Sequence, residues 1–392
     1  MYKILIQLTY RMVPALATIL DIFDTLLSKI IGTSSPVTKR IENNFKRILT
    51  TELFTPEGET LFRPTFQKLK LDLNQVCEKW DLVESIDWFE NVLDYNVPHG
   101  KLQRGLLLVN TFKALANNPT EEQIHCSRVL GWCGELLQSC SLVADDMMDS
   151  SPLRRGRPSW YKVDSVGMNA INDAFYLESS VYYLLKKYFG GTPVYTDLVD
   201  AFHETTLKTI FGQNLDVMAS KKKLEDRFKM ESFSRIAKYK TSYYTFVMPL
   251  RLGAILAGLK DSKLYGKIET IGLLLGNIFQ AQDDFLDVYG DPAKTGKKGT
   301  DISEGKCTWL ICKAMELADH DQRAILEQNY GKQDDESVLI VKSIFQELQI
   351  DERFRQYRSE SMDKIRAQIS SINGRNIRLQ AILKLLVERL AI

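Results

Sequence analysis

Two groups of aspartates with the same spacing are the residues of this 392-residue chain best suited to chemistry. They are Asp145-Asp146-Met147-Met148-Asp149 and Asp283-Asp284-Phe285-Leu286-Asp287. In each group the first and last aspartates lie four residues apart, so on a helix they project from one face. Carboxylate oxygens are the ligands that Mg²⁺ prefers, and Mg²⁺ leaves positions open for substrate phosphates. The spacing predicts two carboxylate walls that bind metal through Asp145, Asp146, Asp149, Asp283, Asp284 and Asp287.

A solvated helix end is the alternative interpretation of each group. Apolar residues at helical spacing precede both groups, from Leu130 to Ala144 and from Ile268 to Phe285. Both groups are therefore expected near helix C-termini, where negative charge opposes the helix dipole. A single motif of this kind is prone to false matches. Because the same costly arrangement occurs twice, we favour cation binding.

Basic residues suited to phosphate lie around these aspartates in the sequence. Arg154 and Arg155 follow the first group directly, and the planar guanidinium group matches phosphate oxygens. Lys101 and Arg104 lie between Gly100 and Gly105, which allow close approach of a ligand. The remaining members of the set are Lys240, Lys297 and Lys306. Each alone is typical of a solvated surface charge, but together they indicate a diphosphate site.

The elements that position these residues are predicted to be helices. Breaks fall at Pro152, at Gly190–Pro193, at Lys260–Ser262 and at Gly290–Pro292, and apolar residues recur with the helical period between them. We find no alternating strand pattern and no glycine-rich phosphate loop. The prediction is an all-α fold, one large bundle of long helices around a central cavity.

Composition excludes some classes of protein. A net charge of +1 argues against a nucleic-acid partner held by bulk electrostatics. The six cysteines form no CxxC pair, which indicates reduced packing thiols rather than a disulfide framework.

Residues 1–40 differ from the predicted catalytic domain at 41–392. Residues 1–20 contain no acid, and Lys3 and Arg11 are basic, as in a mitochondrial transit peptide. The alternative is an extension without a targeting role, so the predicted location is cytoplasmic or mitochondrial. Lys3 and Arg11 also interrupt any span long enough to cross a membrane.

The chain from about Phe66 onward resembles the trans-isoprenyl diphosphate synthases, in particular farnesyl diphosphate synthases of the animal type. Leu137–Tyr161 is similar to the first aspartate-rich motif of the family, and Phe279–Leu310 to the second. Further similarity lies in Gly100–Gly105, Phe211–Asp216 and Tyr239–Phe246.

The resemblance implies an all-α isoprenoid synthase fold, a homodimer, and about three Mg²⁺ ions per site for which Mn²⁺ or Co²⁺ can substitute. It implies that the metals hold an allylic diphosphate, dimethylallyl or geranyl, while isopentenyl diphosphate attacks it to give farnesyl diphosphate or a related product. The implied allylic diphosphate residues are Arg154, Lys240, Gln280, Lys297 and Lys306. The implied isopentenyl diphosphate residues are Lys101, Arg104, Gln138 and Arg155. The catalytic group would comprise Lys240, Thr241, Gln280 and Lys297, with the dipoles of Thr241, Tyr244 and Gln280 near the carbocation.

Three departures from the family pattern bear on the reaction. Cys140 and Ser141 stand where farnesyl-making members have two bulky aromatics, which predicts a deeper product pocket. His99 and Gln103 replace a glycine and an asparagine around Lys101, and the chain ends in Ala391-Ile392 rather than a basic cluster. Two of these departures concern the binding of isopentenyl diphosphate, the second substrate. A terpene synthase that only ionises an allylic diphosphate is therefore the main alternative. A catalytically silent scaffold is a third hypothesis, against which the intact acidic groups argue.

Overall fold

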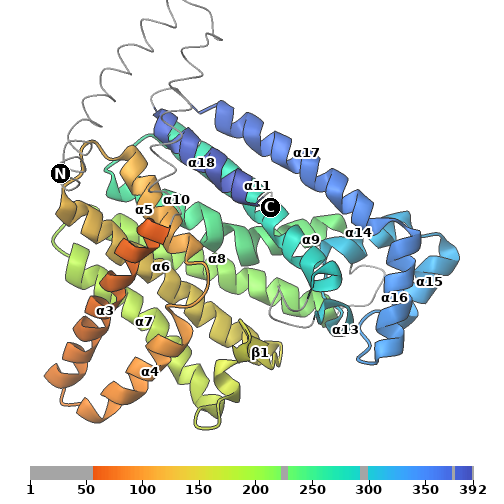
Figure 1. The fold of residues 1–392 in the computed structure, drawn as a ribbon, viewed down its shortest axis with the longest axis horizontal. Helices are drawn as coiled ribbons and strands as arrows, with labels where there is room; N and C mark the ends of the chain where they lie inside the picture. Colours follow the sequence, from red (N-terminus) through yellow and green to blue (C-terminus); the bar gives the residue numbers. More distant parts are fainter. Residues whose placement is uncertain (1–55, 222–227, 292–298, 373–375, 391–392) are drawn as a thin grey trace, which may run out of the picture.

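The helical period of the sequence is realised as long packed helices in the computed structural model, which describes residues 56–221, 228–291, 299–372 and 376–390 (Figure 1). The predicted all-α fold is confirmed. The predicted boundary between an extension and the catalytic domain at residues 40 and 41 lies outside the described residues. The elements up to residue 221 are α3 (Pro56–Lys79), η1 (Val83–Ser85), α4 (Ile86–Asn96), α5 (Gln103–Leu115), α6 (Glu121–Met148), β1 (Leu153–Arg154), β2 (Arg157–Pro158), η2 (Trp160–Lys162), η3 (Gly167–Asn169), α7 (Ala170–Phe189) and α8 (Tyr195–Lys221).

The second half of the chain completes the bundle. Its elements are α9 (Met230–Ile236), the π-helix η5 (Ala237–Val247), α10 (Met248–Leu256), α11 (Ser262–Tyr289), α13 (Asp301–Glu304), α14 (Trp309–Leu317), α15 (His320–Asn329), α16 (Asp335–Glu347), α17 (Ile350–Ser370) and α18 (Ile377–Leu390). None of the helices in the described ranges is long and apolar enough to cross a membrane.

The two helices that carry the acidic groups are both 28 residues long and begin with side-chain caps. Thr120 and Gln123 form a capping box at the start of α6. The Asp261 carboxylate accepts hydrogen bonds from the first backbone N–H groups of α11. These caps set where each helix starts, and its length then carries the acidic group to the far end.

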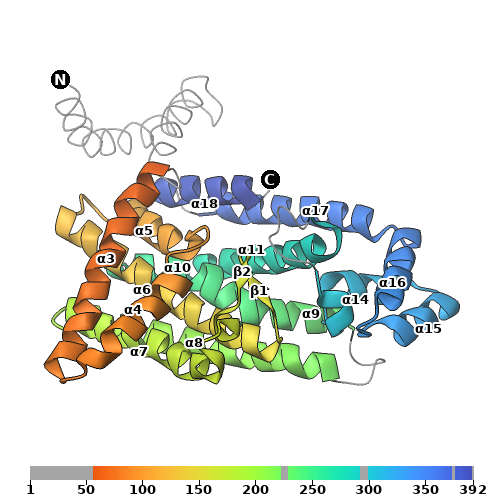
Figure 2. The same ribbon diagram turned by 60° about the horizontal axis from the view of Figure 1, so that its bottom comes forward.

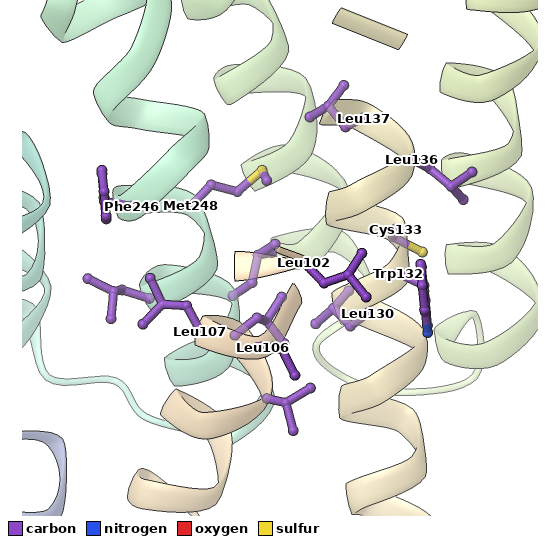
Figure 3. Close-up of a cluster of buried hydrophobic side chains, with 14 of the residues drawn as sticks. Leu102, Leu106, Leu107, Leu130, Trp132, Cys133, Leu136, Leu137, Phe246 and Met248 are labelled. Carbon is purple, nitrogen blue, oxygen red and sulfur yellow. The ribbon is translucent and has the colours of Figure 1, made fainter. Parts of the chain in front are cut away.

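Helix α6 packs closely against α5 in the main core. A Cβ atom on Gly131 would lie 2.9 Å from the Gly105 carbonyl oxygen, so only glycine permits this separation. Figure 3 shows Leu106 and Leu107 of α5 between Leu130 of α6 and Phe246. A second core lies around α14 and α16, with Trp309 and Phe345 buried within it. Helix α11 contributes Ile278 to the main core and Ala281 to the second core, and the second acidic group follows Ala281.

A short hairpin and the π-helix were not predicted from the sequence. Strands β1 and β2 pair antiparallel across Arg155 and Gly156, which both have positive φ, as a two-residue hairpin turn requires. Strands of two residues are too short to show alternation. The π-helix has the same kind of apolar periodicity as an α-helix over so few turns.

Candidate active site

The ends of α6 and α11 border one charged region. Asp145 lies in the last turn of α6, and Asp149 caps the helix at its C-terminus. Arg154 pairs with Asp146 and lies 3.5 Å from Asp145. Burial opposes the charged form of its guanidinium group, but Asp146, Asp145 and Asp283 raise the pKa of that group. Members of both acidic groups therefore act electrostatically on one arginine.

Lysine ammonium groups lie between the carboxylates of the first acidic group and a further aspartate, Asp216 of α8. The Nζ of Lys240 lies 3.2 Å from Asp145 and 2.6 Å from Asp216. The Nζ of Lys306 lies 2.7 Å from Asp149 and 3.5 Å from Asp216. Two lysines and three aspartates thus form one ion-pair network across residues far apart in the chain.

The network shifts the pKa values of its members. Burial is the largest single influence on Asp145 and Asp216 and opposes their ionisation. Lys240 and Lys306 together, with Arg154 at Asp145, outweigh it and lower the pKa of both carboxyls. Burial likewise disfavours the charged form of Lys240, yet Asp216 and Asp145 raise the pKa of its ammonium group. All three groups are therefore charged near neutral pH.

The middle aspartate of each group is buried and bound by protein. Asp146 accepts hydrogen bonds from Arg154, with its Oδ1 3.0 Å from Nε. Asp284 accepts hydrogen bonds from Nε2 of Gln280 at 2.9 Å and from the Trp309 N–H at 2.8 Å. Burial is the main cause that raises the pKa of both carboxyls, in each case against these hydrogen bonds.

Two further groups complete this part of the site. The Thr241 hydroxyl donates to Oε1 of Gln280 at 2.6 Å, so Asp284, Gln280 and Thr241 form a hydrogen-bonded chain from α11 to the π-helix. Asp283 is exposed, and Asp287 accepts a hydrogen bond from the Asp301 N–H at 3.0 Å. Predicted Lys297 lies outside the described residues.

The carboxylates fit Mg²⁺ by their chemistry. In the described part of the chain, no three histidine, cysteine, aspartate or glutamate side chains come together closely enough to hold an ion by themselves. Each acidic group instead offers the pair of carboxylates four residues apart on one helix face. Mg²⁺ commonly binds to one or two carboxylates and fills its other positions with water and substrate phosphates. The lysines that lie between these carboxylates mark positions where positive charge is stabilised.

The predicted isopentenyl diphosphate residues surround the start of α5. Arg104 donates to the Thr245 hydroxyl at 2.8 Å and lies over the Tyr244 ring at 4.4 Å. The Arg104 Nε and the Gln138 Oε1 are buried and have no hydrogen-bond partner among the described residues. Buried polar atoms are normally paired, so these two retain capacity for a ligand. Lys101 is exposed.

The two predicted product-pocket residues differ in direction. Ser141 lies four residues before Asp145 and so on the same face of α6. Burial raises the pKa of the Cys140 thiol to about 12, and Glu178 of α7 adds to the rise, which places the thiol on the side of α6 near α7. Both side chains are half-buried.

Sequence analysis missed three polar residues that organise the site. Asp216 joins both lysines, and Gln213 donates to Asp145 at 2.9 Å. Glu135 is buried in α6, accepts a hydrogen bond from the Gly105 N–H at 2.8 Å, and interacts with Arg104 and Arg155. Gln213 and Asp216 lie in a stretch that resembles the family. Of these three residues, only Glu135 had a local sign of a special role in the sequence, because it is an acid within an apolar helical run.

Comparison with known proteins identifies the family of this chain. A model of the polyprenyl synthetase family matches residues 86–348. The farnesyl pyrophosphate synthase of Candida albicans is 43% identical over 320 residues, which cover 80% of this chain and 91% of that protein. A protein named farnesyl pyrophosphate synthase 1, mitochondrial, from Arabidopsis thaliana is 38% identical over 87% of this chain and 89% of its own.

Solved structures agree with the fold. The farnesyl diphosphate synthase of T. brucei in complex with risedronate superposes with a TM-score of 0.78 at 29% identity. The superposition covers 84% of this chain and 98% of that structure. The chain therefore belongs to the polyprenyl synthetase family and is a trans-prenyltransferase.

Proposed function

We propose that this protein joins isopentenyl diphosphate head to tail with dimethylallyl or geranyl diphosphate, giving farnesyl diphosphate, in a Mg²⁺-dependent reaction. The observation that carries the proposal is the network of Lys240 and Lys306 with Asp145, Asp149 and Asp216. Alternating charges of this kind suit the binding of a diphosphate together with its metal ions. The relatives named above are synthases of the same product. None of them supports the alternative of a terpene synthase.

The residues of this chain would divide the work between the two substrates. Asp145, Asp149, Asp283 and Asp287 would hold Mg²⁺, which supplies positive charge to the departing diphosphate. Asp146 and Asp284 complete the acidic walls and also position Arg154 and Gln280. Arg154, Lys240, Lys297 and Lys306 bind the allylic diphosphate. Lys101, Arg104, Gln138 and Arg155 bind isopentenyl diphosphate.

The reaction breaks the bond between the allylic carbon and the diphosphate oxygen. The double bond of isopentenyl diphosphate then attacks that carbon, and a proton leaves to the released diphosphate. Arg154, Lys240 and Lys306 stabilise the charge that develops on the leaving group. Thr241 and Gln280 present dipoles to the carbocation, and their hydrogen bond holds them in place.

Incubation of the full chain with Mg²⁺, labelled geranyl diphosphate and isopentenyl diphosphate tests the proposal. Farnesyl diphosphate should form only when both substrates and Mg²⁺ are present. A hydrocarbon or alcohol formed from the allylic substrate alone would instead identify a terpene synthase. No release of diphosphate under any condition would identify a scaffold.

We also propose that the protein is a homodimer. A separate proposal is that residues 1–40 determine whether it is located in the cytoplasm or in mitochondria. The named Arabidopsis relative is described as mitochondrial. A fluorescent protein fused after residue 40 should reach mitochondria if this segment is a transit peptide. A fusion that stays in the cytoplasm would exclude that role.

A further inference from the structure

A cavity of about 260 Å³ lies beside the first acidic group, on a neighbouring face of α6. Asp146 and Val143 line it, whereas Asp145 and Gln138 project from the helix at a different angle. The other walls come from the end of α4, the loop before α5, and the hairpin after α6. Their members include Tyr95, His99, Gly100, Arg154, Arg155 and Arg157.

The cavity carries an excess of positive charge. Three arginines and one carboxylate line it, and Asp146 pairs with Arg154. Burial lowers the pKa of the Arg155 guanidinium group, and nearby Glu135 opposes this shift. Arg157 donates to a carbonyl and has no ion pair with a carboxylate in the described residues. A guanidinium group without an acidic partner beside a cavity favours an anionic ligand.

Contacts with Tyr95 hold Arg157 in place, and hydrogen-bond donors of its guanidinium group remain available. Its Nη2 donates to the Tyr95 carbonyl at 2.6 Å, and its guanidinium group lies over the Tyr95 ring at 4.0 Å. The Nε2 of His99 lies 2.8 Å from the Asp94 carbonyl and 3.4 Å from Nη1 of Arg157. A carbonyl only accepts, so this nitrogen carries a proton and cannot accept from Arg157. The hydrogens of Nη1 therefore remain available.

Gly100 joins this cavity to the predicted isopentenyl diphosphate site. Its φ of +93° suits glycine, and a Cβ atom there would lie 2.9 Å from Cζ of Arg155. Arg155 therefore rests directly on the backbone next to Lys101. Arg155 belongs both to the predicted isopentenyl diphosphate site and to the lining of the cavity. An anion bound by Lys101 and Arg155 would therefore lie at the edge of the cavity that Arg157 lines.

We propose that Arg157 is a further binding residue for the diphosphate of isopentenyl diphosphate. The His99 ring lies beside its guanidinium group and limits by contact, without a hydrogen bond, where that group can lie. The inference rests on the proposed function, because it names a residue of that same site. A diphosphate has two phosphoryl groups, so two arginines on adjoining walls can each bind one of them. Arg157 would supply the support that the sequence departure at Gln103 removes.

Steady-state kinetics of Arg157→Gln test the assignment. The KM for isopentenyl diphosphate should rise about tenfold, the usual effect of losing one charge-assisted hydrogen bond. The KM for geranyl diphosphate should stay within about twofold of wild type, because the allylic site does not include Arg157. Arg157→Lys, which retains the charge, should recover part of the loss. Arg366→Gln, at an exposed arginine of α17, is the matched control and should change neither constant.

A binding experiment separates this inference from the proposed function. Calorimetric titration of the full chain with isopentenyl diphosphate measures its affinity without turnover. If wild type does not condense but Arg157→Gln still weakens binding about tenfold, the proposed function fails and this assignment stands. If wild type condenses and Arg157→Gln changes neither KM nor affinity, the assignment is overturned.

A second variant guards against a folding defect in Arg157→Gln. His99→Gly leaves Arg157 in the chain and removes only the ring beside it. We expect the KM for isopentenyl diphosphate to rise about threefold, with kcat unchanged. The assignment would be overturned if the KM for isopentenyl diphosphate were unchanged both in His99→Gly and in a folded Arg157→Lys.

Discussion

Asp145, Asp149 and Asp216 face the ammonium groups of Lys240 and Lys306 rather than one another. Carboxylates at the C-terminal end of a helix oppose the helix dipole, and clustered carboxylates repel. The lysines offset both costs when no metal is bound. They would also be the groups nearest to a diphosphate that arrives with Mg²⁺.

Replacement of Asp216 by Asn tests how much this network contributes to the stability of the fold. Its carboxylate is 8% exposed, so its loss leaves two mostly buried lysines with less compensation. We expect the free energy of unfolding at pH 7 to fall by about 3 kcal/mol, measured by urea denaturation. Asp363→Asn, at an exposed pair with Arg366, should cost under about 1 kcal/mol.

The effect of Asp216→Asn should depend on pH in a defined direction. The pKa of Asp216 is lowered from its ordinary value of 3.8, burial being outweighed by Lys240 and Lys306. A lowered pKa gives stability that is present above the unfolded value and lost as pH falls through the folded value. The difference between wild type and variant should therefore shrink below pH 3.8. A difference that is the same at low and neutral pH would contradict this account.

The two small residues before the first acidic group should differ in their effect on product length. Ser141 shares a helix face with Asp145, whereas Cys140 turns toward α7. Ser141→Phe should therefore shorten the longest prenyl product, measured by chromatography of the product diphosphates. Cys140→Phe should alter product length less and destabilise the fold by about 1–3 kcal/mol through overpacking. A larger change in product length from Cys140→Phe would show that our placement of these residues is wrong.

At the scale of elements, the π-helix η5 depends on glycines of its neighbours. A Cβ atom on Gly212 of α8 would lie 2.1 Å from the Lys240 backbone nitrogen. A Cβ atom on Gly276 of α11 would lie 2.1 Å from the Ser242 hydroxyl. Both contacts are too short for any side chain. The glycines thus allow η5 to lie tightly between α8 and α11, which presents Lys240 and Thr241 to the site.

Alanine at Gly276 should disturb both stability and catalysis. We expect a loss of about 1–3 kcal/mol in the free energy of unfolding, because η5 must move to admit the methyl group. The KM for the allylic diphosphate should rise, since Lys240 and Thr241 move with η5. Gly266 lies in the same helix with open space around it. Gly266→Ala should therefore raise the free energy of unfolding by about 0.5–1 kcal/mol. Equal effects of the two substitutions would rule out close packing as the cause.

At the scale of the whole molecule, α7 and α8 run along one outer side of the bundle (Figure 2). Their outward residues include several large apolar side chains that are 46% to 64% exposed, namely Ile171, Phe175, Leu207, Ile210 and Phe211. Exposed apolar side chains gathered on one surface favour an interaction site. We therefore place the proposed homodimer interface on these two helices.

Phe175→Asp combined with Leu207→Asp should convert the proposed dimer to a monomer. A buried carboxylate without a partner opposes association across an apolar interface. Sedimentation equilibrium should give about twice 44.9 kDa for wild type and 44.9 kDa for the variant. Leu339→Asp, at a similarly exposed leucine of α16, is the control and should leave the mass unchanged. A wild-type mass of 44.9 kDa would contradict the proposed dimer.

The sequence by itself determined the helical class and the two acidic groups. Helical periodicity and a spacing of four residues are local properties, because both follow from the rise and twist of one helix. The motifs also identified the family before any coordinates. The extent of α11 followed from local signals in the same way, through the breaks predicted at Lys260–Ser262 and Gly290–Pro292.

Only the tertiary structure decided how the charged residues pair. Lys240 and Asp145 are 95 residues apart, and Lys306 and Asp149 are 157 apart, so no local pattern links them. The structure also separates the buried Asp146 and Asp284 from the less buried aspartates of their groups, and Ser141 from Cys140. Such distinctions depend on which face of a helix meets which partner. That is set by packing between helices, because the sequence spacing alone is the same in either case.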